Sequence, residues 1–328
     1  MKSRDLTIRA FAPASVGNVG VGFDVLGLAL EGVGDTVELT LNSGTREILI
    51  ESIFTENKIP ADPKQNTATA ALLAMQKDLN LSYGFRVRIH KGIPLGSGMG
   101  GSAASAVAAV VAAAGIFRRL KSRVQNPIPM EQLFTYALEG ERIAAGSAHP
   151  DNVAPSLYGG LTLSSSQFST SLAKSVFHIS IPSGIVCVLV HPDVQVETKQ
   201  ARKILRPEIS LKSYVEQSSL LAGFVLGCMT SNFGLISASL RDQIIEPQRE
   251  HLIPAFQDVK NAAMAIPGCL GFSISGSGPS VFALAKSRTA GQKIAQEIQK
   301  RFKIAGVTST AYISRLPAPG ARGFKGEK

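Results

Sequence analysis

Short stretches of alternating polar and apolar residues are interleaved with longer stretches that have a helical repeat. Alternating or β-branched segments predict four early strands, at Leu6–Ala12, Thr36–Leu41, Glu47–Ser52 and Phe85–His90. Apolar positions spaced along one helix face predict helices at Thr67–Asn80, Ser102–Phe117 and Met130–Ala145. Strands and helices thus occur together without an internal repeat, and the pattern predicts an α+β fold.

The second half of the chain repeats this mixture. Strand signals at 161–164, 176–181 and 185–190 give way to helical segments up to about residue 265. Further strands are predicted at 272–275, 281–284 and 308–313, with a helix at 289–302 before the last of them. The polar, serine-rich stretch Ser164–Ser175 predicts a boundary between an N-terminal domain, 1–168, and a C-terminal domain, 169–316. Residues 317–328, rich in Gly, Pro and Lys, are expected to form a flexible tail.

Composition indicates a folded protein outside the membrane. Of 328 residues, 45% are hydrophobic and 18% are charged, as in globular proteins and unlike disordered ones. The first residues are charged, without the apolar core of a secretory signal, and the longest apolar stretch, Ala103–Phe117, is shorter than the roughly 20 residues that span a bilayer. Three scattered cysteines fit neither a disulfide framework nor a metal site. A cytoplasmic location is expected.

The net charge of +10 raises the possibility of a nucleic-acid partner. Basic clusters such as Arg118–Lys121 and Lys300–Lys303 fall at predicted helix ends, where cations are favoured by the helix dipole. Solvated helix ends therefore explain most of the charge, and anionic small substrates are the next explanation. No nucleic-acid partner and no membrane partner are expected.

A glycine-rich segment stands directly before the apolar helix. Gly96–Gly101 fits G-x-G-x-x-G, the dinucleotide fingerprint, but no strand leads straight into it and no acidic residue closes a following strand. It also approximates a P-loop, yet Gly101 stands where the essential lysine belongs. Glycines before a helix that opens at Ser102 still allow backbone amides to approach an anion, and Lys91 is close enough in sequence to assist. The alternative is a simple turn before a buried helix.

Two further loops weaken the alternative that the glycine-rich segment is only a turn before a buried helix. Residues 272–281, read as FSISGSGPSV, place glycines between two apolar strands. Residues 12–24, read as APASVGNVGVGFD, follow the first strand and bring Asn18 and Asp24 into a flexible segment. Alone, either loop is compatible with an ordinary hairpin.

These three segments, together with HPDNVAPSLYGG at residues 149–160, resemble the motifs of the GHMP kinases, the superfamily of galactokinase, homoserine kinase and mevalonate kinase. The resemblance covers about residues 10–313 and is closest to the homoserine kinase branch, whose HPDN segment other branches lack. One departure is Gly101 before Ser102, where many members carry two serines. The resemblance implies a first domain like the second domain of ribosomal protein S5 and a ferredoxin-like second domain, with ATP and substrate between them.

The resemblance also implies the site residues. An ATP site with its phosphate loop is implied at Asn66, Lys91, Pro94, Leu95, Gly96, Ser97, Gly98, Met99, Gly100, Gly101, Ser102 and Ser105. Mg²⁺ is assigned to Ser102 and Glu141. The substrate carboxylate is assigned to Arg202 and Arg249, and its amino group to Asp24 and His149. Catalytic positions are Asn18, Asn152 and Thr198, with Asn152 at the reacting hydroxyl, and Asp151 and Gly276 complete the substrate-binding set.

The implied activity is ATP-dependent phosphorylation of the side-chain hydroxyl of L-homoserine, which gives O-phosphohomoserine for threonine synthesis. A homodimer is expected by the same resemblance. Asp24 is the obvious candidate for a general base, but its implied role at the ammonium favours direct proton passage to the phosphate. The rivals are a GHMP kinase for another small alcohol, a catalytically silent ligand-binding protein of this fold, and a nucleic-acid binder.

Overall fold

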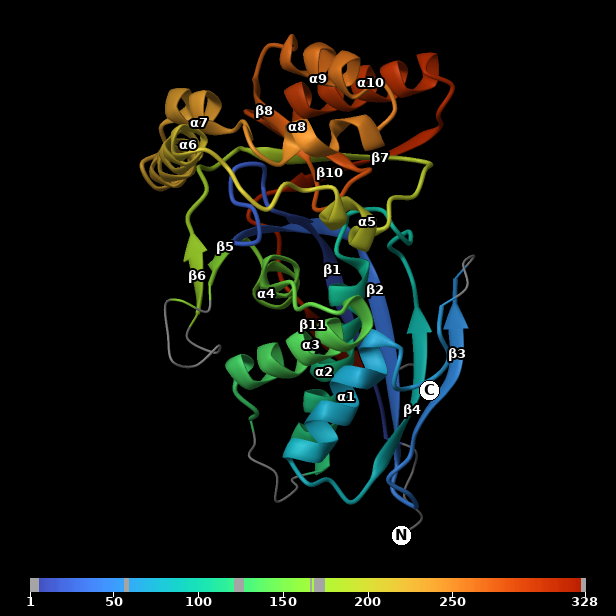
Figure 1. Cartoon of the computed structure of the whole chain (residues 1–328). Coiled ribbons are helices and arrows are strands. Elements are labelled where there is room, and N and C mark those ends of the chain that lie inside the picture. Colours follow the sequence, from blue (N-terminus) through green and yellow to red (C-terminus); the bar gives the residue numbers. More distant parts are fainter. Residues whose placement is uncertain (1–5, 56–58, 121–126, 166, 168–174, 326–328) are drawn as a thin grey trace.

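A computed structural model describes residues 6–55, 59–120, 127–165, 167 and 175–325. Two β-sheets form the framework, each covered by helices on one face, and the chain enters the second sheet after strand β6 (Figure 1). Mixed α+β architecture is therefore confirmed.

The first sheet has seven strands in the described residues, with the central order β11-β1-β2-β4-β3 and with β5 and β6 attached beside β2. Its strands are β1 Thr7–Gly17, β2 Leu26–Asn42, β3 Ile48–Phe54, β4 Gly84–His90, β5 Leu161–Ser164, β6 Val176–Ile179 and β11 Arg322–Lys325. Along β2, Val33, Val37 and Leu39 are buried while Thr36 and Glu38 between them are partly exposed. This alternation places one face of the sheet against helices.

Four helices cover that face: α1 Thr67–Asp78, α2 Gly101–Leu120, α3 Met130–Ala145 and α4 Pro150–Tyr158. Every residue of α2 from Ala103 to Phe117 is buried, as expected for a helix that is apolar on all sides. Among the described helices, α2 is the one whose length and composition would suit a membrane span, but 83% of its apolar window is buried inside the protein. We therefore assign α2 as a core helix.

The second sheet has four antiparallel strands in the order β10-β7-β9-β8, with β7 Val186–Pro192, β8 Cys269–Ile274, β9 Val281–Ala285 and β10 Ser309–Arg315. In chain order this is 4-1-3-2, the order of a ferredoxin-like sheet, as the resemblance implies. Helices α9 Phe256–Met264 and α10 Arg288–Ile304 pack on it. Between β7 and α9 lie α5 Thr198–Lys203, α6 Leu211–Met229, α7 Phe233–Ser239, α8 Glu246–Arg249 and the 3₁₀ helix Glu250–Leu252.

The end of the chain differs from the expectation of a flexible tail. Ala318 accepts a hydrogen bond from the Gly160 amide (2.9 Å), and Ala321 donates to Ser156 (2.9 Å). Strand β11 then pairs antiparallel with β1. The free edge of β1 supplies backbone partners that the Gly- and Pro-rich composition does not reveal. Residues 326–328 lie outside the described residues.

Candidate functional site

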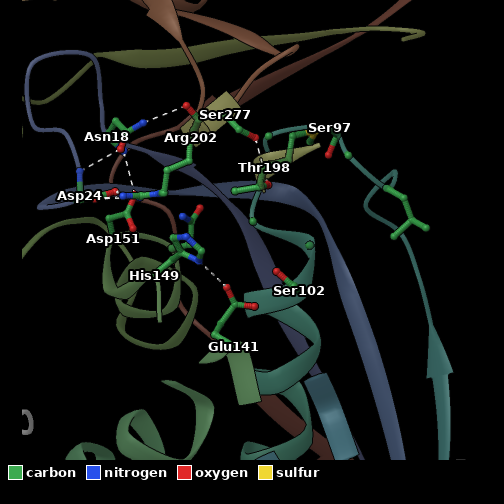
Figure 2. Close-up of a pocket in the computed structure, with 18 of the residues that line it drawn as sticks. Asn18, Asp24, Ser97, Ser102, Glu141, His149, Asp151, Thr198, Arg202 and Ser277 are labelled. Atoms are coloured by element: carbon green, nitrogen blue, oxygen red, sulfur yellow. Dashed lines mark hydrogen bonds and ion pairs between the residues drawn. The ribbon is translucent and has the colours of Figure 1, made fainter. Parts of the chain in front are cut away.

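A cavity of about 180 Å³ lies between the two sheets, where loops and helix ends from both halves of the chain meet (Figure 2). It brings together most of the residues singled out from sequence: Asn18, Asp24, Pro94, Leu95, Gly96, Ser97, Gly98, Met99, Gly100, Gly101, Ser102, Glu141, His149, Asp151, Asn152, Thr198, Arg202, Arg249 and Gly276. Phe23 and Ser277 also line it and were not expected. Segments more than 200 residues apart thus form one site.

The glycine loop between β4 and α2 forms one wall. Gly96, Gly98 and Gly100 have φ angles of 61°, 72° and 68°, in the left-handed region that favours glycine. A Cβ at Gly98 would lie 2.4 Å from the carbonyl oxygen of Ser275, so the loop backbone packs directly on the β8–β9 loop. Only glycine fits this close approach.

Hydrogen bonds from strand β1 and from the β8–β9 loop hold the glycine loop. The Ser275 hydroxyl donates to the Gly98 carbonyl (2.8 Å), and the Ser15 amide donates to that of Met99 (3.0 Å). Because these carbonyls are held from behind, the amides of the loop and of the first turn of α2 form a fixed wall suited to an anion. Ser102 stands on that first turn (Figure 2).

Three predicted ATP-site residues do not line the cavity. The Lys91 ammonium pairs with the buried Asp35 carboxylate and donates to the Gly101 carbonyl (2.8 Å) and the Ser105 hydroxyl (2.9 Å). Lys91 and Ser105 therefore brace the loop from beneath. Asn66 caps α1 by accepting from the Ala68 amide (3.1 Å). The position of these residues along the chain did not reveal that their polar groups bond to other parts of the protein.

The opposite wall carries opposite charges. Arg202 on α5 donates to both oxygens of Asp24, at 2.7 and 2.9 Å. Arg249 on α8 is 3% exposed and donates to the carbonyls of Ala201 and Gly276, each at 3.0 Å. Burial, and then the neighbouring Arg202, lowers the pKa of Arg249 to about 10. Arg249 therefore remains a guanidinium cation at neutral pH.

Phe23 contacts both arginines through its ring. Its ring centroid is 5.3 Å from the Cζ atom of Arg202 and 5.4 Å from that of Arg249. Cation–π attraction at these distances favours both guanidinium groups beside the ring. An apolar residue in a glycine-rich loop gives no sequence signal for this role.

Asn18 organises the loop that follows β1. Its side chain accepts from the Asp24 amide (3.0 Å) and donates to the Gly276 carbonyl (2.9 Å), while its own amide donates to Asp151 (3.2 Å). Asn18 and Asp24 both have positive φ, at 68° and 59°, which is uncommon for residues other than glycine. Strained backbone of this kind is found at functional sites, and here it brings Asp24 to Arg202.

Two buried carboxylates, from Glu141 and Asp151, complete the floor. Glu141 is 2% exposed and contacts His149 through one oxygen (3.3 Å), which raises the pKa of His149 above its usual value. Asp151 is 2% exposed, and burial followed by the nearby Asp24 charge raises its pKa to about 6. In each residue the other carboxylate oxygen, Oε1 or Oδ1, is buried without a partner in the described residues. A buried carboxylate oxygen without a protein partner is the kind of group that a bound ion, water or ligand satisfies.

Comparison with known proteins agrees with this geometry. The family model "GHMP kinases N terminal domain" matches residues 66–160, and "GHMP kinases C terminal" matches residues 221–304. A homoserine kinase of Xylella fastidiosa (strain M12) is 43% identical over 315 residues, covering 96% of this chain and 93% of its own. The chain belongs to the GHMP kinase family. The resemblance drawn from the motifs is therefore confirmed.

Related proteins agree over nearly the whole chain. A homoserine kinase of Xanthomonas campestris pv. campestris (strain B100) is 41% identical over 314 residues and covers 96% of this chain and 93% of its own. The crystal structure of homoserine kinase from Cytophaga hutchinsonii has a TM-score of 0.90 and 40% identity, with 99% of both chains covered. The GHMP kinase fold expected from sequence is thus confirmed.

GHMP kinases bind ATP, and a magnesium ion fits the donor set of this cavity. Glu141 has an orphaned buried oxygen, and Ser102 offers a hydroxyl in the same cavity. Within the described residues no three His, Cys, Asp or Glu side chains gather as a metal site. One carboxylate and one hydroxyl are typical of Mg²⁺ that takes its other ligands from phosphates and water.

Proposed function

We propose that this protein is a homoserine kinase that transfers the γ-phosphoryl group of ATP to the side-chain hydroxyl of L-homoserine, as its relatives' names indicate. The observation that carries the proposal is the pairing of two walls in one cavity. A backbone wall suited to phosphate faces a wall with Asp24, Arg202 and Arg249. A zwitterionic amino acid needs such an arrangement, whereas a neutral sugar does not.

ATP binds with its phosphates against the Gly96–Ser102 loop and the start of α2. Ser102 and Glu141 would hold Mg²⁺, which neutralises charge on the phosphate oxygens when bound. The loop amides are already oriented by Ser275 and Ser15, so they stabilise transition-state charge without reorganisation.

Homoserine binds against the charged wall. Arg249 and Arg202 grip its carboxylate, Asp24 receives its ammonium, and the Asn152 amide positions the hydroxyl. The Ser15 hydroxyl donates to Asn152 Oδ1 (2.9 Å) and so fixes that amide. Thr198, beside Ser277 at 3.4 Å, closes the cavity near the glycine loop.

The homoserine oxygen attacks the γ-phosphorus, the bond to the ADP oxygen breaks, and the hydroxyl proton passes to the transferred phosphate. Asp24 is a weak candidate for general base because Arg202 donates to both of its oxygens. Positioning and electrostatic stabilisation suffice for this reaction class.

We also propose a cytoplasmic homodimer without a nucleic-acid or membrane partner, and a division of the chain into domains 1–168 and 169–316. Helix α6 supports the dimer, since it leaves Leu211, Val215, Leu226 and Met229 exposed. Light scattering after size exclusion tests it, and a monomeric mass contradicts it. Limited proteolysis tests this division. Strand β6 follows residue 168 in the chain but pairs with β5 in the first sheet.

ADP release with Mg-ATP tests the function directly. The purified protein is offered L-homoserine, D-homoserine, L-serine, mevalonate and galactose separately. Turnover confined to L-homoserine supports the proposal. Turnover with mevalonate or galactose instead keeps the fold and the phosphate wall but overturns the substrate, and no turnover with any alcohol supports a silent binder.

A further inference from the structure

A second acidic cluster lies outside the cavity, around the short helix α8 that carries Arg249. Asp242 and Glu246 are 8% and 3% exposed, on the segment that leads into α8 and on α8 itself. Neither residue lines the cavity. Buried carboxylates are costly unless they are paired and hydrogen-bonded, so their partners show what they hold in place.

The Asp242 side chain holds the start of α8 by accepting hydrogen bonds from backbone amides there. One carboxylate oxygen accepts from the amides of Ile244 (2.9 Å) and Ile245 (3.0 Å), and the other accepts from the Glu246 amide (2.9 Å). A helix of only four residues, Glu246–Arg249, has little intrinsic stability. Its orientation therefore depends on this cap.

Glu246 ties the same short helix to the second sheet. Its carboxylate pairs with the Lys260 ammonium on α9 and accepts from the Ser273 hydroxyl on β8 (2.6 Å). Burial raises the pKa of both the Asp242 and the Glu246 carboxyl above their usual values. The cluster thus attaches α8 to two elements of the ferredoxin-like half at the cost of burying two acids.

Arg249 links α8 to Arg202, the other arginine assigned to the substrate carboxylate. From the last position of α8 it donates to the carbonyl of Ala201, the residue before Arg202, at 3.0 Å. Asp242 also attracts the guanidinium electrostatically. A shift of α8 would therefore move Arg249 directly and Arg202 through α5.

We propose that Asp242 and Glu246 are positioning residues for recognition of the substrate carboxylate, which act by fixing α8 and through it both arginines. This inference rests on the proposed function, because it assigns the arginines to the homoserine carboxylate. The glycine loop and Glu141 make their direct hydrogen bonds with other residues, so we expect ATP binding to change less than homoserine binding.

The test compares Asp242→Asn and Glu246→Gln with Asp258→Asn, which changes an exposed acid on α9. We expect KM for L-homoserine to rise about 5- to 20-fold in both cluster variants, with kcat and KM for ATP within about twofold. The control stays unchanged. Equal losses in kcat and in both KM values, or no change in KM for homoserine, would overturn the proposal.

A second readout separates positioning from general loosening of the fold. The substrate 3-aminopropan-1-ol has the hydroxyl and the ammonium but no carboxylate. Preference for L-homoserine over this alcohol, as a ratio of kcat/KM values, should fall by the same factor as the rise in KM. An unchanged ratio would contradict the inference. If wild-type protein fails to use L-homoserine, the proposed function itself fails.

Lys260→Met gives an independent check through the partner of Glu246. Alone it should raise KM for homoserine much as Glu246→Gln does, because it leaves a buried carboxylate unpaired. In the double variant, KM for homoserine should rise by less than the product of the two single increases, because no unpaired charge remains. Strictly multiplicative losses would show that the two residues act separately, against the proposal.

Discussion

The two walls of the cavity are built in different ways. The phosphate wall consists of backbone, with glycines at positive φ and carbonyls held by Ser275 and Ser15. The substrate wall consists of charged side chains from separate elements, such as Asp24 after β1 and Arg202 on α5. Backbone geometry suits an anion that every member of the family binds, whereas side chains can be exchanged for a different substrate. Changes to the first wall should therefore impair catalysis or ATP use, and changes to the second should impair homoserine binding.

The largest effect is expected at the junction of the walls. Glu141→Gln keeps the shape of the side chain but removes the charge proposed to hold Mg²⁺. We expect kcat to fall about 100- to 1000-fold, measured over a range of magnesium concentrations. Glu139→Gln, on the same helix but on the surface with Arg142, is the matched control and should be nearly neutral. Equal activity of the two variants would show that Glu141 does not hold the metal ion.

On the phosphate wall, Gly98→Ala introduces a methyl group against the Ser275 carbonyl and strains a φ of 72°. We expect kcat/KM for ATP to fall about 30- to 100-fold, with KM for homoserine little changed. Gly44→Ala is the control, because a Cβ there meets nothing within 4 Å. A larger effect on homoserine than on ATP would break the division between the walls.

On the substrate wall, Arg249→Lys and Arg202→Lys keep the charge but lose the guanidinium fork. KM for L-homoserine should rise about tenfold or more for Arg249, which is buried, and about threefold for Arg202, whose side chain is 43% exposed. KM for ATP serves as the internal control and should not move. A larger rise in KM for Arg202→Lys than for Arg249→Lys would show that burial does not determine how much each arginine contributes to homoserine binding.

The smallest effect is on stability and comes from Asp151. Burial raises its pKa from 3.8 to about 6, so the folded chain binds the proton more tightly than the unfolded chain does. The cost of burying the charge is therefore complete above pH 6 and disappears as the pH falls toward 4. Asp151→Asn should stabilise the protein by at least about 1 kcal/mol at pH 8, and this gain should shrink toward zero near pH 4, measured by urea unfolding. A constant difference across this range would contradict the pKa assignment.

The same contrast explains what the sequence could reveal. Glycine loops, buried strands and the all-apolar helix α2 are local patterns, and they predicted the fold class and the phosphate wall. Phe23 and Asp35 act only through partners far along the chain, so no local signal marked them. Lys91 was placed at the phosphates by proximity in sequence, but its ammonium is committed to Asp35. Helix α4 was missed because Pro150 and Pro155 resemble helix breakers, although Pro150 occupies the first turn, where proline is tolerated.

The most direct measurement for this account is kcat/KM of the wild-type protein for three alcohols at saturating Mg-ATP. These are L-homoserine, 4-hydroxybutyrate, which lacks the ammonium, and 3-aminopropan-1-ol, which lacks the carboxylate. If the substrate wall recognises both charges, each analogue loses one charge-assisted contact with the wall and should lose at least about 1000-fold in kcat/KM relative to L-homoserine. Either analogue within about tenfold of L-homoserine would contradict the account, because one end of the charged wall would then have no part in recognition.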